Sequence, residues 1–210
     1  MTPEFAEWTI TLVGHWNVRI FSPEWVATNL FEVPEVQAEV AIGPELGPIR
    51  YIWGNVVLVP SPHQLIVGMR DSERLTLEKA SSVATNLLAL LPHTPIRAFG
   101  INFGFIEENP SDDLVKLFQL SDSAKLSDMH CDILKTELHR AVQIDGKLLN
   151  LLLGLDNGKL SVRLNYHFNV TGAIDAKDKL FSNAVVLLKS QSDSFLSQTY
   201  GLTLENNDEE

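Results

Sequence analysis

The residues most able to do chemistry recur at every second position in two segments of the chain. These residues are His15, Asn17 and Arg19 near the start, and Arg163, Asn165 and His167 in the last third. Imidazole, amide and guanidinium groups on one surface could converge on a ligand or on a partner protein. The same pattern is typical of the wet face of an ordinary antiparallel sheet. We treat these residues as a candidate binding surface and add His139 as a further member.

Motifs for metal binding, phosphate binding or nucleophilic catalysis do not stand out. His130, Cys131 and Asp132 are three possible metal ligands in a row, but neighbours in an extended strand point to opposite faces. We interpret this run as the start of a strand with a buried thiol. Gly100 to Gly104 lies inside a predicted strand, whereas a phosphate cradle requires a loop before a helix. We expect no catalytic residue, no metal and no cofactor, while enzymatic activity stays an open alternative.

The first polar group is expected on a long strand. From Trp8 to Ile20, apolar and polar residues alternate almost without interruption, which is the period of a half-buried strand. Ser22 and Pro23 then provide an N-cap and a proline at the first position of a short helix that continues to about Phe31.

Three strands and a long helix complete the first half. Turns rich in Gly and Pro separate strand candidates at 36–42, 50–59 and 64–70. From Leu75, apolar residues recur at helical spacing until Pro92 ends the helix.

The second half repeats this order of elements. Strands are expected at 97–106, 132–144, 147–155 and 162–170, with a short helix after Ser111. The sequence Asp156-Asn157-Gly158 predicts a tight hairpin between the last two strands. A long helix from Ala173 to Tyr200 closes the unit, with Leu180, Phe181, Ala184, Leu187, Leu188 and Phe195 facing inward.

The sequence therefore predicts an α+β fold with a tandem duplication of a β-α-β-β-β-α unit. The units cover residues 5–91 and 96–200 of a single pseudo-symmetric domain, 1–204, which an acidic disordered tail follows at 205–210. This order of elements resembles the TATA-binding-protein-like fold over nearly the whole chain. The resemblance implies a curved antiparallel sheet with two long helices packed on one face, and by itself it implies no activity.

The charge of the chain argues against the DNA binding of that family. The formal net charge is −11, and acidic residues outnumber basic ones in both halves, so a phosphate backbone would meet net repulsion. Phe99, Phe103 and Phe105 could serve as wedges between bases. They alternate with Gly and Ala, however, as expected of a strand with a bulky core face and a small face that allows close approach.

The compartment follows from the thiol and from the absence of targeting signals. The single Cys131 favours a reducing cytoplasm. The first residues lack the basic region and apolar run of a signal peptide, and no stretch approaches the ~18 apolar residues of a membrane span.

Two functional hypotheses remain. The first is a non-catalytic binding or adaptor protein that engages another protein, or a second copy of itself, through its sheet face or rim. The alternative is a small-molecule-binding protein or enzyme with a pocket between the sheet and the long helices. A cluster of His15, His139 and His167 beside an enclosed cavity would favour the alternative, whereas a filled sheet with an exposed apolar patch would favour the first hypothesis.

Overall fold

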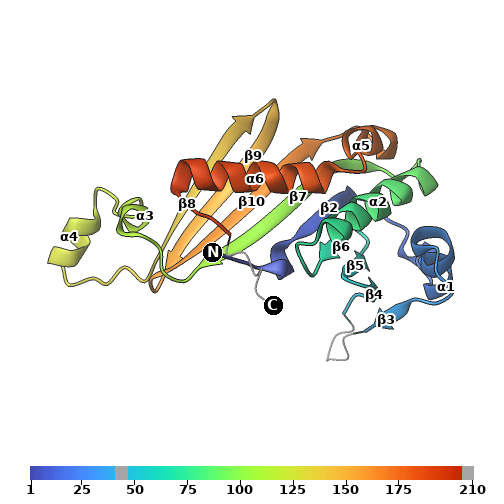
Figure 1. The fold of residues 1–210 in the computed structure, drawn as a ribbon, viewed down its shortest axis with the longest axis horizontal. Coiled ribbons are helices and arrows are strands. Elements are labelled where there is room, and N and C mark those ends of the chain that lie inside the picture. Colours follow the sequence, from blue (N-terminus) through green and yellow to red (C-terminus); the bar gives the residue numbers. More distant parts are fainter. Residues whose placement is uncertain (41–46, 205–210) are drawn as a thin grey trace.

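A computed structural model describes residues 1–40 and 47–204 of the chain. It has a mixed α/β architecture, in which ten strands form one curved, open sheet (Figure 1). Every strand pair in this part of the chain is antiparallel. The predicted turn at Gly43-Pro44 and the predicted acidic tail at 205–210 lie outside the described residues.

The first half of the chain supplies six strands and five helical segments. The strands are β1 (Thr2–Pro3), β2 (Thr9–Gly14), β3 (Gln37–Glu39), β4 (Arg50–Trp53), β5 (Val56–Pro60) and β6 (Gln64–Met69). The helical segments are η1 (Phe5–Glu7), η2 (Val18–Ile20), α1 (Pro23–Trp25), the π-helix η3 (Val26–Phe31) and α2 (Arg74–Leu90).

The second half supplies four longer strands and four helices. The strands are β7 (Ile96–Glu107), β8 (Lys135–Ile144), β9 (Lys147–Asp156) and β10 (Lys159–Asn169). The helices are α3 (Asp112–Lys116), α4 (Ser123–Asp128), α5 (Ala173–Lys179) and α6 (Ala184–Tyr200).

The two halves join at the centre of the sheet. The strand order is β3-β4-β5-β6-β2-β7-β10-β9-β8, and the short β1 pairs with β7. The central strands β2 and β7 pair with each other, so that Ile10 lies opposite Ile101 and Leu12 lies opposite Phe99. The sheet is therefore continuous from one half of the chain to the other.

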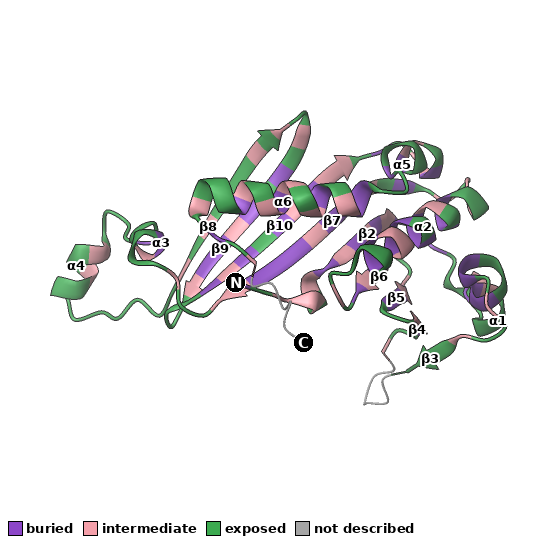
Figure 2. Ribbon diagram, viewed as in Figure 1, coloured by how far each residue is buried: buried purple, intermediate pink, exposed green. Residues whose placement is uncertain are grey.

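The hydrophobic core lies between one face of the sheet and the two long helices (Figures 1 and 2). Alternate residues of the central strands, such as Phe99 and Ile101, are buried there, and so are Leu87 of α2 and Leu188 of α6. The buried Tyr166 of β10 meets Ser192 of α6 through their hydroxyl groups at 3.2 Å. Because the helices cover only this face, the opposite face of the sheet, called the open face below, is left to carry polar side chains.

Several local predictions are confirmed. Ser22 Oγ accepts a hydrogen bond from Trp25 N, and Ser111 Oγ accepts one from Leu114 N, so both serines cap the helices predicted after them. The hairpin at 156–158 forms as the sequence indicates, with positive φ at Asn157 (48°) and Gly158 (83°).

The first long strand is shorter than predicted. It ends at Gly14, where its pairing with β7 shifts register. Asn17 Oδ1 then accepts a hydrogen bond from Arg19 N and caps η2, because a short amide side chain can compete with the strand for backbone donors. Val18 is exposed and does not continue the core face.

Three further predictions are wrong. The strand predicted at 50–59 is two strands, because Gly54 turns the chain with a φ of 60°. The helix predicted at 173–200 is interrupted between α5 and α6, and this break leaves Phe181 and Leu187 exposed. Cys131 is exposed in the loop before β8, so its thiol is not buried.

Among the described helices, none combines the length and the apolar character that a membrane crossing requires.

Candidate functional site

A row of amide side chains crosses the open face of the sheet. Asn102 of β7, Asn165 of β10 and Asn150 of β9 lie opposite one another in the strand register. Asn150 Nδ2 donates to Asn165 Oδ1 at 3.0 Å, and Asn165 Nδ2 donates to Asn102 Oδ1 at 2.6 Å. Asn102 Nδ2 in turn donates to Thr9 Oγ1 of β2 at 2.9 Å. The amide row thus links four neighbouring strands and fixes the orientation of each side chain.

Two glycines of β7 make room for polar side chains on this face. A β-carbon at Gly100 would lie 2.5 Å from Asn165 Nδ2, and one at Gly104 would lie 2.5 Å from the β-carbon of Glu7. The alternating phenylalanines of β7 are buried on the other face. The small face of β7 therefore allows close approach as predicted, while its phenylalanines are not available as wedges for DNA.

The chain brings Glu7 onto the open face by leaving the strand ladder. Pro3 of β1 lies opposite Phe105 and Thr9 of β2 lies opposite Asn102, so both strands pair with β7 while η1 loops out between them. Glu7 Oε1 reaches Arg163 NH2 at 3.2 Å. This ion pair is partly exposed, with 39% of the Glu7 side chain and 48% of the Arg163 side chain accessible.

A groove of about 580 Å³ follows the amide row over β7, β10, β9 and β8. Its polar lining comprises Glu7, Asn102, His139, Arg140, Asn150, Arg163 and Asn165. Leu152 of β9 also lines the groove, and it pairs with Arg163 on one side and with His139 on the other. Arg163 and His139 therefore flank an apolar side chain, at a separation of two strand spacings, or about 10 Å.

The edge strand β8 supplies the outer wall of the groove. His139 Nε2 lies 3.7 Å from Glu137 Oε2, and Lys135 Nζ lies 2.6 Å from Glu137 Oε1. The hydrogen bond from Lys135 is the main reason that the pKa of Glu137 lies below its ordinary value. Glu137 is therefore held as a carboxylate between two basic side chains.

The structure brings together three of the residues that the sequence singled out. His139, Arg163 and Asn165 line the groove. His167 lies on the same strand and face as Arg163, opposite Gly100, and its Nε2 is 3.1 Å from Asn169 Oδ1.

The other three predicted residues, His15, Asn17 and Arg19, lie beyond the end of β2, away from the groove. His15 N donates to Pro95 O, and the His15 ring lies edge-on to the His63 ring with centroids 6.1 Å apart. His15 and Asn17 border a separate depression of about 340 Å³ beside the loop after α2. The cluster of His15, His139 and His167, which would have favoured the small-molecule alternative, is therefore not formed.

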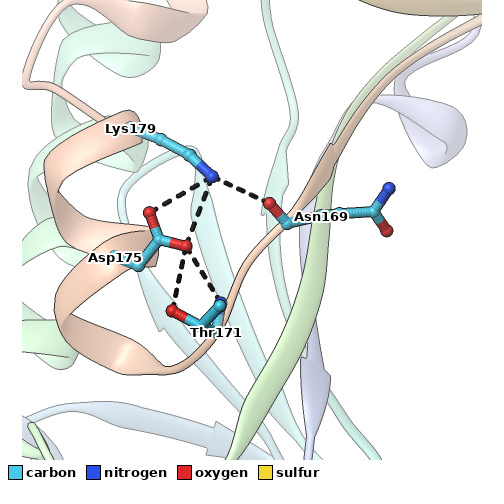
Figure 3. A network of polar contacts seen from close by, with 4 residues as sticks. All are labelled: Asn169, Thr171, Asp175 and Lys179. Atoms are coloured by element: carbon cyan, nitrogen blue, oxygen red, sulfur yellow. Dashed lines mark hydrogen bonds and ion pairs between the residues drawn. The ribbon is translucent and has the colours of Figure 1, made fainter.

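A polar network fixes the end of β10 where it turns into α5 (Figure 3). Asp175 Oδ2 accepts hydrogen bonds from Thr171 N at 2.9 Å and from Lys179 Nζ at 3.2 Å. Lys179 Nζ also donates to Asn169 O at 2.9 Å. Because these contacts tie α5 to the last residue of β10, they hold the segment that carries His167 and Asn169.

Sequence reasoning missed four polar residues of the groove: Glu7, Asn102, Arg140 and Asn150. A single asparagine within the leucine-rich run of β9 was a local signal for Asn150. Asn102 sits on the small face of β7 and could have been assigned from alternation. Glu7 had no local signal, because its position depends on the glycine at 104 on another strand.

The rim of the sheet carries apolar side chains that face solvent. The connection between β7 and β8, which holds α3 and α4, projects from one end of the sheet (Figure 1). Its exposed apolar residues are Leu117, Leu120, Met129, Ile133 and Leu134.

The groups in the groove are suited to hydrogen bonding and ion pairing. Within residues 1–40 and 47–204, no three His, Cys, Asp or Glu side chains are arranged to hold a metal ion.

In comparisons with known proteins, no family model matches the chain. A search of curated proteins likewise finds no significant match to its sequence.

Proposed function

We propose that this chain is a non-catalytic binding or adaptor protein that engages another protein through the open face of its sheet. The observation that carries this proposal is the groove over β7, β10, β9 and β8, with the amide row along its floor. Protein interfaces combine apolar contacts with a limited number of well-placed polar groups. The groove has this character, because Leu152 lies between Arg163 and His139.

The rigidity of the groove supports a binding role. The amides of Asn165 and Asn102 are already oriented by hydrogen bonds to neighbouring strands. A partner would therefore meet side chains that lose little conformational freedom on binding, which lowers the cost of association. The exposed apolar side chains at the rim offer additional contact area of the kind that marks interaction surfaces.

The alternative is a small-molecule-binding protein or an enzyme with a pocket between the sheet and the long helices. Core side chains such as Tyr166 and Leu188 are buried in that layer. The groove described above lies on the other face and is only partly enclosed. Because small-molecule sites enclose most of their ligand, an open groove favours a protein partner.

Native mass spectrometry of protein purified gently from its own source tests the proposal. We expect a second protein, or a second copy of the chain, bound to the 23.4 kDa chain in stoichiometric amount. Asn150→Ala should lose this partner, because Asn150 is exposed and lines the groove. Gln143→Ala is the matched control, since Gln143 is an exposed amide on the same face beyond the groove.

Two outcomes would contradict the proposal. A bare chain in every sample would remove its support. A small retained mass, lost in the Asn150→Ala variant, would favour the small-molecule alternative instead.

We further infer that residues 5–91 and 96–200 are tandem copies of one unit in a TATA-binding-protein-like arrangement. The order of elements supports this inference, because a strand, a short helical segment, further strands and a long helix occur twice. The central position of β2 and β7, the leading long strands of the two halves, supports it as well. A reducing cytoplasm is our inference for the compartment, and the lone, exposed thiol of Cys131 supports it.

A further inference from the structure

We propose that the groove recognises an extended acidic segment of its protein partner, and that a carboxylate of that segment replaces Glu7 on Arg163. This inference rests on the proposed function and adds the chemistry of the partner. The groove already contains one carboxylate, Glu7, which the chain itself places beside Arg163.

Arg163 is placed to receive a carboxylate from outside. Its neighbours in the strand register are Gly104 and Leu152, neither of which carries a charge. Glu7 contacts the guanidinium through a single pair of atoms, Oε1 and NH2. A guanidinium can bind a carboxylate through two parallel hydrogen bonds, so a better-placed carboxylate could displace Glu7.

The segment that delivers Glu7 is shaped for this contact. Between the pairs Pro3–Phe105 and Thr9–Asn102, five residues of the N-terminal segment face two residues of β7. Extra residues of this kind redirect side chains and are common beside functional sites. The exposed ion pair that results contributes little stability. Glu7 therefore acts as a weak internal competitor that an incoming acid can replace.

The net charge of the chain opposes an acidic partner over most of its surface, so binding of such a partner depends on the local cation Arg163. The chain carries a formal charge of −11, so most of its surface repels an acidic segment. Arg140 also borders the groove, but its guanidinium donates to Tyr200 of α6, which lies on the covered face. Once Glu7 moves away, Arg163 is an uncompensated cation in the groove.

The spacing of the groove suggests where the acids of the partner lie. Arg163 and His139 are two strands apart, or about 10 Å, which corresponds to about three residues of extended chain. A peptide that crosses the strands places one acid on Arg163 and a second, three residues along, beside His139. There the second acid competes with Glu137, as the first competes with Glu7. Its backbone would pass over the amides of Asn165 and Asn150.

A single-stranded nucleic acid is a second kind of extended anionic polymer. Such polymers are held mainly by bases that stack on exposed aromatic rings. Among the described residues that line the groove, Phe103 is the one Phe, Tyr or Trp, and it is buried. The amide and leucine lining therefore favours a peptide.

Fluorescence anisotropy at low ionic strength tests the proposal. The probe is a labelled Gly-Ser peptide with two glutamates three residues apart. We expect it to bind the wild-type chain and to bind Glu7→Gln about two- to fivefold more tightly, because the competitor is gone. Arg163→Gln should weaken binding by about tenfold or more. Lys159→Gln is the matched control, since Lys159 pairs with Glu108 and does not line the groove.

Circular dichroism of each variant establishes that the fold is retained. Equal binding by the wild-type and Arg163→Gln chains would overturn the proposal, as would equal binding of a peptide with glutamines in place of the glutamates. Binding of a labelled oligothymidine that depends on Arg163, without binding of the acidic peptide, would overturn it in favour of nucleic acid.

The two proposals fail separately. A protein partner that is lost in Asn150→Ala but kept in Arg163→Gln would overturn the acidic segment and leave the proposed function standing. Conversely, the acidic peptide could bind as expected while no protein partner is retained by the native chain, which would overturn the adaptor role alone.

Discussion

The amide group of Asn165 lies against the backbone of Gly100, so that a β-carbon at position 100 would stand 2.5 Å from the Asn165 Nδ2 atom. The amide is held in this place by its hydrogen bond to Asn102. The amide row can therefore stay continuous only while position 100 carries no side chain.

Gly100→Ala should destabilise the chain by about 1–3 kcal/mol, because the new methyl group must push the amide out of the row. Gly68→Ala is the matched control: it is also a strand glycine, but its β-carbon would meet Val57 at an ordinary 3.8 Å. We expect the control to be neutral or slightly stabilising. Urea denaturation measures both free energies of unfolding. If Asn165→Ala in the Gly100→Ala background restores stability, the clash is with the amide of Asn165. Equal losses of stability in Gly100→Ala and Gly68→Ala would contradict this account.

Leu87→Ala and Leu187→Ala should differ sharply in stability. Leu87 of α2 is fully buried, so its truncation leaves a cavity and should lower the free energy of unfolding by about 2–5 kcal/mol. Leu187 is 51% exposed on α6, so its truncation should change the free energy of unfolding by about 0.5 kcal/mol or less. Urea denaturation of the two variants compares them directly. A loss above 2 kcal/mol at Leu187 would mean that its side chain is covered in solution, for example by a second copy of the chain.

These two leucines also show which buried positions could be predicted from the sequence. Alternation and helical spacing are local, so the buried faces of β7, β10 and α2 could be predicted residue by residue. The orientation of Leu187 could not, because the chain breaks between α5 and α6, and the helix that restarts at Ala184 leaves Leu187 exposed. The break contains Ser182 and Asn183, which favour turns over helix, but a single sequence does not indicate how the helix restarts.

The groove shows the same division between local and non-local information. Arg163 and Asn165 were predictable, because their strand alternates regularly and its polar face is evident. His15 was misplaced because the strand before it ends at Gly14, where a β-carbon would stand 2.5 Å from Pro95 O in a distant part of the sequence. Glu7 was missed for the same reason, because its place on the open face depends on Gly104 of another strand.

The stability of the chain should fall in acid partly through Asp175. The backbone hydrogen bond from Thr171, followed by the contact with Lys179, holds the pKa of Asp175 below its ordinary value in the folded chain. This contribution is present above the ordinary pKa of an aspartate and is lost as the pH falls through the lower folded value. Urea midpoints of wild type and Asp175→Asn should therefore differ at pH 7 and converge in acid, as the pH falls through the lowered pKa of Asp175.

Asp178→Asn, on the same helix, is the control for this pH dependence. Asp178 is exposed, so its variant should follow the wild type over the whole pH range. A difference between wild type and Asp175→Asn that stays constant down to acidic pH would show that the carboxylate charge is not what Thr171 and Lys179 stabilise.

Trp8 should anchor the excursion that carries Glu7. Its indole Nε1 donates to Gly104 O at 2.8 Å, and its buried ring packs edge-on against Phe103 and Phe105. Trp8→Phe removes the donor and part of the buried ring, which should cost about 1–3 kcal/mol.

Trp53→Phe is the control, because Trp53 is only partly buried and its main ring contact is a stack on Phe31 that phenylalanine can keep. Urea denaturation gives the stabilities, and limited proteolysis near the N-terminus reports on η1. Faster cleavage there in Trp8→Phe than in Trp53→Phe is the expected result, and equal protection of the two variants would mean that η1 is held by other contacts.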